Sequence, residues 1–149
     1  MVQCKFRCMS VGKDWQGQMK VSLQPVMKSE KHPENAVWSK YTPAGDCELT
    51  LGPEHKSEFI PGDYYFIDME LAVAKEGEKL WKLWEIREQE EDITVKLSAP
   101  WTHEVHALQS GSFEATINNK DCWPNYQGHV GSKWRVTFKW ACSSADGEE

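Results

Sequence analysis

The sequence predicts an all-β protein built from two related antiparallel modules, and three observations support this fold class. Short segments of alternating apolar and polar residues recur through the 149 residues, with turn signals between them, a pattern typical of small sandwiches and barrels. Segments of the first half are echoed in the second half in the same order, which indicates a repeat. Aromatic residues make up 11% of the chain, and they suit small β cores because each buries a large apolar area.

The first half contains four expected strands and one short helical turn. Alternation predicts strands at residues 3–11, 19–26, 47–51 and 64–72. Pro25 suits a strand end, because proline has no N–H to give to the ladder. Residues 34–38 are expected to form one helical turn, with Trp38 folded back as a plug over the barrel mouth or sandwich end. The sequence Pro61-Gly62-Asp63 predicts a turn before the fourth strand.

The second half contains four further expected strands. They lie at residues 80–87, 93–97, 113–117 and 133–140. The first of these also fits helical spacing, and the repeat favours a strand there. In the last strand, one face carries Trp134, Val136, Phe138 and Trp140, and the other carries Lys133, Arg135, Thr137 and Lys139. Such alternation directs the aromatic face inward.

Three pairs of segments carry the repeat. Residues 21–23 match 95–97, residues 45–51 match 111–117, and residues 61–72 match 130–141. The offset between the copies differs from one pair to the next, so the frame drifts only between strands, where loops absorb insertions. We therefore expect a first β module at 1–74, a second at 75–142 and a flexible acidic tail at 143–149. Each module is a sandwich or partly open barrel, and the two are packed together.

The acidic charge is concentrated in two places. The net charge is −6, residues 76–92 hold seven acidic and three basic side chains, and the last four residues hold three acids. The remaining body is nearly neutral, so no basic face favours nucleic acid. There is no apolar run long enough to span a membrane and no apolar leader after Met1. We expect reduced thiols and a cytoplasmic location.

Motifs of catalysis and of metal binding are weak. The sequence contains no phosphate loop, nucleophile elbow or paired-carboxylate signature, so we expect a protein that is not an enzyme and holds no cofactor. Four residues have types that ligate zinc, and whether they bind a metal stays open: His103, His106, Cys122 and His129.

Two surfaces are candidates for binding. The first is an acidic set that suits a basic protein partner, although a solvated face is the usual meaning of such a run; it comprises Glu85, Glu88, Glu90, Glu91 and Asp92. The second is an alternative surface for single-stranded nucleic acid, with bases stacked on aromatic rings beside basic side chains; it comprises Tyr64, Phe66, Lys133, Arg135 and Lys139. Asp68 and Glu70 weaken that alternative by repulsion, and the rings also suit packing between the modules.

Residues 21–71 resemble small accessory proteins of tailed phages and prophages. The resemblance is carried by Val21–Val26, Glu34-Asn35 with Trp38, residues 41–45, Glu48-Leu49 and residues 59–65, preceded by a strand like 4–8. It implies a phage-encoded accessory protein and supplies no catalytic residues. The second half departs from the pattern, because Val130-Gly131 stands where the first half has Pro61-Gly62.

These observations favour a phage accessory protein that binds a host or phage macromolecule in the cytoplasm of the infected bacterium. We expect an inhibitor of a host defence effector such as a CRISPR nuclease. The alternatives are a single-stranded nucleic-acid-binding module and a structural protein of the virion.

Overall fold

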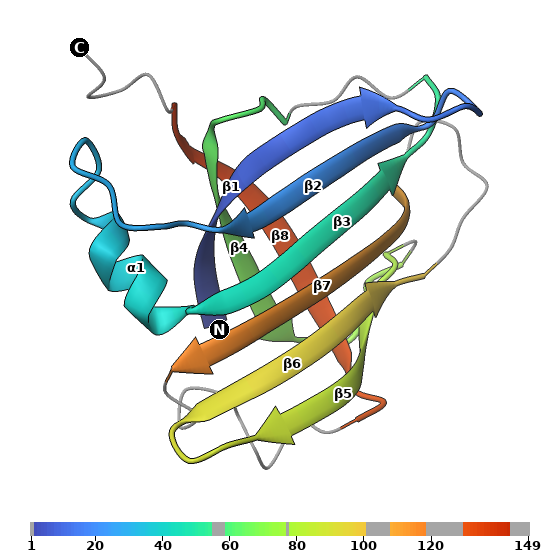
Figure 1. The fold of residues 1–149 in the computed structure, drawn as a ribbon. Helices are drawn as coiled ribbons and strands as arrows, with labels where there is room; N and C mark the ends of the chain where they lie inside the picture. The colour runs from blue at the N-terminus through green and yellow to red at the C-terminus, as the bar shows by residue number, and fades with distance from the viewer. Residues whose placement is uncertain (1, 55–58, 77, 101–107, 119–129, 144–149) are drawn as a thin grey trace.

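The computed structural model describes residues 2–54, 59–76, 78–100, 108–118 and 130–143, and these residues form one closed barrel of eight antiparallel strands (Figure 1). The elements in chain order are β1 (Val2–Lys13), β2 (Met19–Pro25), α1 (Asn35–Tyr41), β3 (Ala44–Leu51), β4 (Tyr64–Leu71), β5 (Trp81–Glu88), β6 (Asp92–Ala99), β7 (Leu108–Asn118) and β8 (Lys133–Cys142). The predicted all-β class is confirmed, and so is a strand rather than a helix after residue 80.

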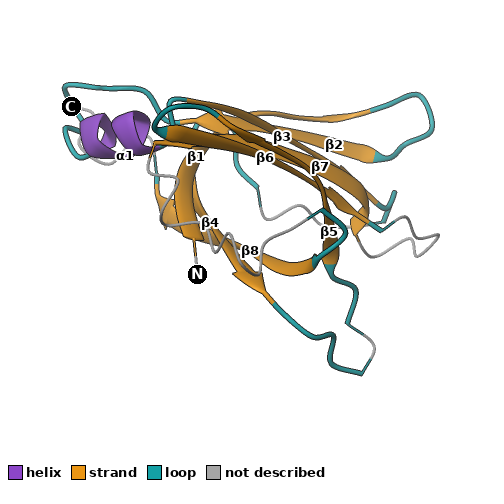
Figure 2. Cartoon of the chain, turned by 90° about the horizontal axis from the view of Figure 1, so that it is seen from below, coloured by secondary structure: helices purple, strands orange, loops and turns teal. Residues whose placement is uncertain are grey.

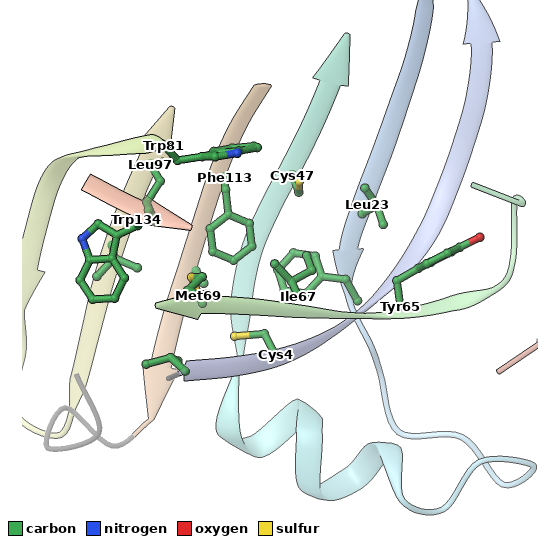
Figure 3. Close-up of a cluster of buried hydrophobic side chains, with 14 of the residues drawn as sticks. Cys4, Leu23, Cys47, Tyr65, Ile67, Met69, Trp81, Leu97, Phe113 and Trp134 are labelled. Atoms are coloured by element: carbon green, nitrogen blue, oxygen red, sulfur yellow. The ribbon is translucent and has the colours of Figure 1, made fainter. Parts of the chain in front are cut away.

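The core fills the inside of the barrel. Figure 2 shows the strands surrounding this interior, and Figure 3 shows buried side chains from several strands meeting there. Cys4, Ile67 and Met69 are fully buried, and Phe113 is 2% exposed. These residues alternate with outward-facing polar ones along their strands, which is the pattern a barrel wall requires. Trp134 is 1% exposed and its indole N–H donates to Ser132 Oγ at 2.9 Å, as a buried indole requires.

The two halves of the chain are wired alike. Around the barrel the strand order is β1-β2-β3-β7-β6-β5-β8-β4. The first half therefore contributes the neighbours β4-β1-β2-β3, and the second half contributes β8-β5-β6-β7. The halves meet where β3 pairs with β7 and where β4 pairs with β8. Two separate modules packed together are not confirmed, because the strands of both halves complete one barrel around one core.

The strand pairings of the two halves correspond residue by residue. Val21 of β2 pairs with Leu49 of β3, and their repeat counterparts, Val95 of β6 and Ala115 of β7, also pair with each other. The register thus follows the matches at which the sequence repeats. We call this relation the half-to-half correspondence. It extends to the other two strand pairs of each half, where β1 corresponds to β5 and β4 to β8.

A bulge recurs at corresponding places and fixes the match of β1 with β5. The register of β1 shifts just after Cys8, and the register of β5 shifts just after Leu83. Opposite each bulge lies a glycine with positive φ: Gly62 at 93° and Gly131 at 95°. The Gly62 N–H donates to the Cys8 carbonyl at 2.8 Å, and the Gly131 N–H donates to the Leu83 carbonyl at 2.7 Å. Glycine takes this backbone conformation without a steric penalty. Both turns therefore have a glycine with positive φ at the same position.

The segment around α1 covers the outside of the wall. Trp38 packs on Phe66, with ring centroids 5.3 Å apart. Phe66 lies on the outward face of β4, so Trp38 covers the wall, and the prediction that it plugs the mouth is wrong. Beneath the same segment, Lys5 is 3% exposed and donates to Asn35 Oδ1 at 2.6 Å. The partners of this buried ammonium reduce the cost of removing it from water.

We expect Gly45→Ala to destabilise the barrel. A Cβ at residue 45 would lie 2.6 Å from the backbone oxygen of Glu114 and 3.1 Å from the Phe6 ring, so the backbone has to shift. The free energy of unfolding, measured by urea titration, should fall by about 1–3 kcal/mol. The control is Gly12→Ala, where a Cβ meets nothing within 4 Å, and it should change stability by less than about 0.5 kcal/mol. Equal stability of the two variants would contradict this packing.

Candidate functional site

Within the described residues, the barrel is closed beside β8 by only a short strand pairing. In the first half, β1 pairs with β4 through six residues, from Val2 to Arg7. In the second half, β5 pairs with β8 through two residues only, Trp81 opposite Trp134 and Lys82 opposite Lys133. Beyond Trp134, one edge of β8 continues along β4. The other edge, from residue 135 to residue 140, pairs with no strand in the described part of the chain.

The backbone of this open edge presents hydrogen-bonding groups. In an antiparallel pair, the N–H and C=O of one residue both point to the same neighbour, and successive residues alternate between neighbours. Ala72 N–H donates to the Lys133 carbonyl at 3.2 Å, so residues 135, 137 and 139 direct their groups to β4. Val136 and Phe138 therefore direct theirs to the open edge. Such unpaired groups are a template for another strand.

A partly open cavity of about 410 Å³, lined mainly by apolar side chains, lies beside the open edge. Its lining comes from β3, β4, β7, β8 and the loop before β4: Leu49, Leu51, Phe59, Tyr65, Leu108, Val136, Thr137, Phe138 and Trp140. The aromatic rings form a connected group, because Phe59 lies 5.0 Å from Tyr65 and 5.7 Å from Phe138 between centroids. This volume is within the range of sites that hold small ligands or side chains.

The cavity occupies the place that β1 fills in the first half. By the half-to-half correspondence, Val136 and Phe138 are the counterparts of Ile67 and Met69. Ile67 pairs with Cys4 and Met69 pairs with Val2, and all four of these residues are at most 2% exposed. Val136 and Phe138 have no such strand beside them in the described ranges and are only partly buried. Trp140, which follows them on the same face, is 57% exposed, so the inward direction predicted for it is not accompanied by burial.

The sequence suggests why residues 78–80, which lie before β5, do not continue the strand into this place. The counterparts of Val2 and Cys4 are residues 77 and 79, which are glycine and lysine. Lys79 at the position of Cys4 would direct an ammonium group into an apolar cavity, which costs several kcal/mol by order of magnitude. Apolar residues that would favour a strand inside the barrel are therefore missing at both positions.

The neighbouring segment is instead held on the outer face of β8. Glu78 accepts two hydrogen bonds from Arg135, at 2.7 Å from Nε and 2.9 Å from Nη2. Arg135 Nη1 also donates to Glu70 at 2.6 Å. The hydrogen bonds from Arg135 lower the pKa of Glu78 to about 2, and both carboxylates raise the pKa of Arg135. Glu78 N–H donates to the Lys75 carbonyl at 2.9 Å, which closes a turn.

The predicted acidic set lies at the opposite end of the barrel. Leu51 pairs with Leu108 at the cavity end of β7, and Asp92 pairs with Asn118 at the other end. The acidic residues belong to the β5–β6 hairpin beside Asp92. Three of them are exposed: Glu88, Glu90 and Glu91. The acidic set and the cavity are thus separated by the length of β7.

Two members of the acidic set already have partners. Glu85 forms ion pairs with Arg87 at 3.1 Å and Lys96 at 3.2 Å. Asp92 accepts a hydrogen bond from Asn118 Nδ2 at 3.0 Å. The charge offered to a basic partner therefore comes mainly from the three exposed glutamates at the hairpin tip.

The aromatic residues of the nucleic-acid alternative are covered. Tyr64 is 6% exposed, with His32 against its ring at 4.8 Å and the Lys5 ammonium 5.1 Å from its centroid. Phe66 is beneath Trp38. Base stacking needs an accessible ring face, and the structure brings these rings into contact with the α1 segment instead.

The basic residues of that alternative are largely neutralised. Arg135 lies between Glu70 and Glu78, and Lys139 forms an ion pair with Asp68 at 2.8 Å. Lys133 is exposed. The structure brings all three onto the outer face of β8, as the alternation predicted, but acidic neighbours accompany two of them.

The thiols and histidines offer little chemistry within the described residues. Cys4, Cys8 and Cys47 are buried, and burial raises the pKa of the Cys8 and Cys47 thiols, which opposes nucleophilic activation. No cluster of three possible metal ligands occurs in the described ranges. The group of His103, His106, Cys122 and His129 falls outside those ranges, as do residues 144–149 of the expected tail. Among the helices described, none is long and apolar enough to cross a membrane.

Comparisons with protein-family models, with curated proteins and with solved structures found no match to this chain. The cavity residues on β3, β7 and the loop before β4 were missed by sequence reasoning. The available signal was Lys79, which breaks the apolar alternation at the position that corresponds to Cys4.

We expect Glu78→Gln to destabilise the protein in a pH-dependent way. The pKa of Glu78 is lower in the folded state than its usual 4.5, so its stabilising effect is present above that value and lost as the pH falls towards about 2. Urea midpoints of the wild type and the variant should differ most near neutral pH and converge in acid. For the control Glu88→Gln, at an exposed position, the difference in urea midpoint from the wild type should not depend on pH in this way. A constant difference at all pH values would contradict the Arg135 contact as its cause.

Proposed function

We propose that this protein is a non-enzymatic binding protein, and that its main interface is the open wall beside β8, where the cavity receives apolar side chains of a partner protein. The observation that carries this proposal is an apolar cavity of about 410 Å³ next to a strand edge that no described strand covers. Ligand-binding sites in β-barrel proteins commonly lie at openings of the barrel.

The composition of the cavity supports protein recognition. Four aromatic side chains line it, and Trp140 is 57% exposed at its rim. Ile60, next to Phe59 in the chain, is 54% exposed. Binding energy at protein interfaces is concentrated in buried aromatic anchors surrounded by polar residues. An apolar group that enters here leaves water and meets these rings.

The partner's origin stays a proposal based on the resemblance to phage accessory proteins. A host defence effector, such as a CRISPR nuclease, is the partner we propose, within the cytoplasm of an infected bacterium. The exposed glutamates of the β5–β6 hairpin would serve as a second contact for a basic surface. They lie at the far end of the barrel, so a partner that reaches both surfaces has to be large.

We also propose that the chain arose by duplication of a four-strand unit. The same wiring, the same registers and the same bulge in both halves support this history. Phe6 lies over Gly45 and Trp81 lies over Gly111, at corresponding positions. Repeated details of this kind are not required for barrel closure, so common descent accounts for them more simply than chance does.

Filling the cavity should abolish the binding of an apolar probe. We expect anilinonaphthalene sulfonate to bind the folded wild type at one site with increased fluorescence, and Val136→Trp to remove most of the increase because the new ring occupies the cavity. Val37→Trp makes the same change at a residue that is 72% exposed on α1 and should leave binding intact. Unchanged binding to a folded Val136→Trp variant would exclude the cavity as the site.

Single-stranded oligonucleotides should not bind appreciably. Tyr64 and Phe66 are covered, and acidic groups accompany Arg135 and Lys139, so we expect no quenching of tryptophan fluorescence by oligonucleotides at low salt. Saturable quenching that weakens as salt is added would instead favour the nucleic-acid alternative.

A further inference from the structure

The open edge of β8 has a counterpart in the same barrel that is filled. Beside β4, the residues Val2 to Lys5 of β1 form an antiparallel ladder with residues 66 to 69. Beside β8, the half-to-half correspondence places the same ladder opposite residues 135 to 138. There, the described pairing of β5 begins only at Trp81. Within the described residues, β4 therefore has a strand along this edge, whereas the corresponding edge of β8 has none.

We propose that the open edge of β8 accepts an extended segment of a partner protein as an added antiparallel strand, whose alternate side chains enter the cavity. This inference rests on the proposed function and specifies how the partner is recognised. Addition of a strand to an exposed edge combines backbone hydrogen bonds, which give affinity, with pockets for alternate side chains, which give specificity.

The filled half defines what the added strand has to look like. Val2 lies opposite Met69 and Cys4 lies opposite Ile67, and both point into the barrel. The corresponding positions of the added strand lie opposite Phe138 and Val136. The partner segment therefore has small or medium apolar side chains at two positions separated by one residue. A charge like that of Lys79 at either position would be excluded, for the reason that keeps the chain's own segment out.

The backbone groups of the edge match such a strand. Val136 and Phe138 direct their N–H and C=O groups to the open side, as derived above from the register with β4. The counterpart residues Ile67 and Met69 direct theirs to β1. An added strand thus gains up to four backbone hydrogen bonds with these two residues.

The outer side of the slot favours polar residues between the apolar ones. Thr137 lies outward between Arg135 and Lys139, and the Lys139 side chain is 59% exposed. At the corresponding place in the filled half, Gln3 Nε2 donates to Asp68 Oδ1 at 2.7 Å. A polar side chain at the outward position of the added strand would lie opposite Thr137, as Gln3 lies opposite Asp68 in the filled half.

The test uses the full-length protein and a fluorescently labelled six-residue peptide in which valine and glutamate alternate. We expect its fluorescence anisotropy to rise saturably on titration with protein. Methylation of the backbone nitrogens of the valines, which lie opposite Val136 and Phe138, removes the donors that face β8. It should weaken binding by about tenfold. A peptide of the same composition with its valines grouped together should bind weakly, since it cannot alternate.

A matched pair of protein variants isolates the backbone edge. Val136→Pro removes the N–H that points to the open side and leaves the ladder with β4 intact, because residues 135 and 137 supply that ladder. It should weaken peptide binding by about tenfold. Val136→Thr keeps the N–H and the branched shape, so weaker binding by Val136→Pro than by Val136→Thr reports the missing N–H rather than the lost valine. Amide hydrogen exchange offers a second readout, in which the peptide should slow exchange at Val136 and Phe138.

The outcomes separate this inference from the proposed function. If the apolar probe binds but the alternating peptide does not, or if the methylated peptide binds equally well, strand addition is overturned and the cavity remains a binding site. If neither probe nor peptide binds, the proposed function fails too. If the protein is a dimer that Val136→Pro converts to a monomer, a second copy covers the edge and the inference of a partner segment is overturned.

Discussion

The backbone hydrogen bonds between neighbouring strands have to close around the whole barrel. Every strand in a barrel needs a neighbour on both sides, because unpaired N–H and C=O groups otherwise lie exposed or buried without partners. Seven of the eight neighbouring strand pairs are hydrogen-bonded over most of the length they share. The described pairing of β5 with β8 extends over two residues, and the open edge of β8 and the partial exposure of Phe138 follow from that shortfall.

Much of the fold was predictable because alternation is a local signal. The all-β class, the strand at 80–87 and the helical turn before β3 agree with the sequence pattern. The single barrel was not predicted, because the choice between two closed units and one shared unit depends on β3 finding β7 and β4 finding β8. Those contacts join residues far apart in sequence, and no local pattern encodes them.

The candidate site was not predictable from residue types alone, because it is defined by what is missing. The residue types of the predicted acidic and aromatic sites suggested binding. In the structure, however, Tyr64 and Phe66 are covered, and Glu85 and Asp92 have partners. The cavity is lined by Leu49, Leu51 and Leu108, which read as ordinary core. The register of the two halves is needed to show that Lys79 corresponds to Cys4, which pairs with Ile67 in the first half.

The barrel is approximately symmetric and departs from symmetry in the described pairing of β5 with β8, which is where we propose that a partner binds. Equivalent residues in the two halves have the same wiring, so packing alone does not distinguish β4 from β8. The distinction comes from four residues, Val2 to Lys5 in one half and 77 to 80 in the other. The first set buries apolar side chains and pairs its backbone, whereas Glu78 of the second set binds Arg135 on the outer face and leaves the inner place without a described strand. In the proposed function, the ion pair between Glu78 and Arg135 would contribute indirectly, because a segment held outside the wall does not compete with an incoming strand.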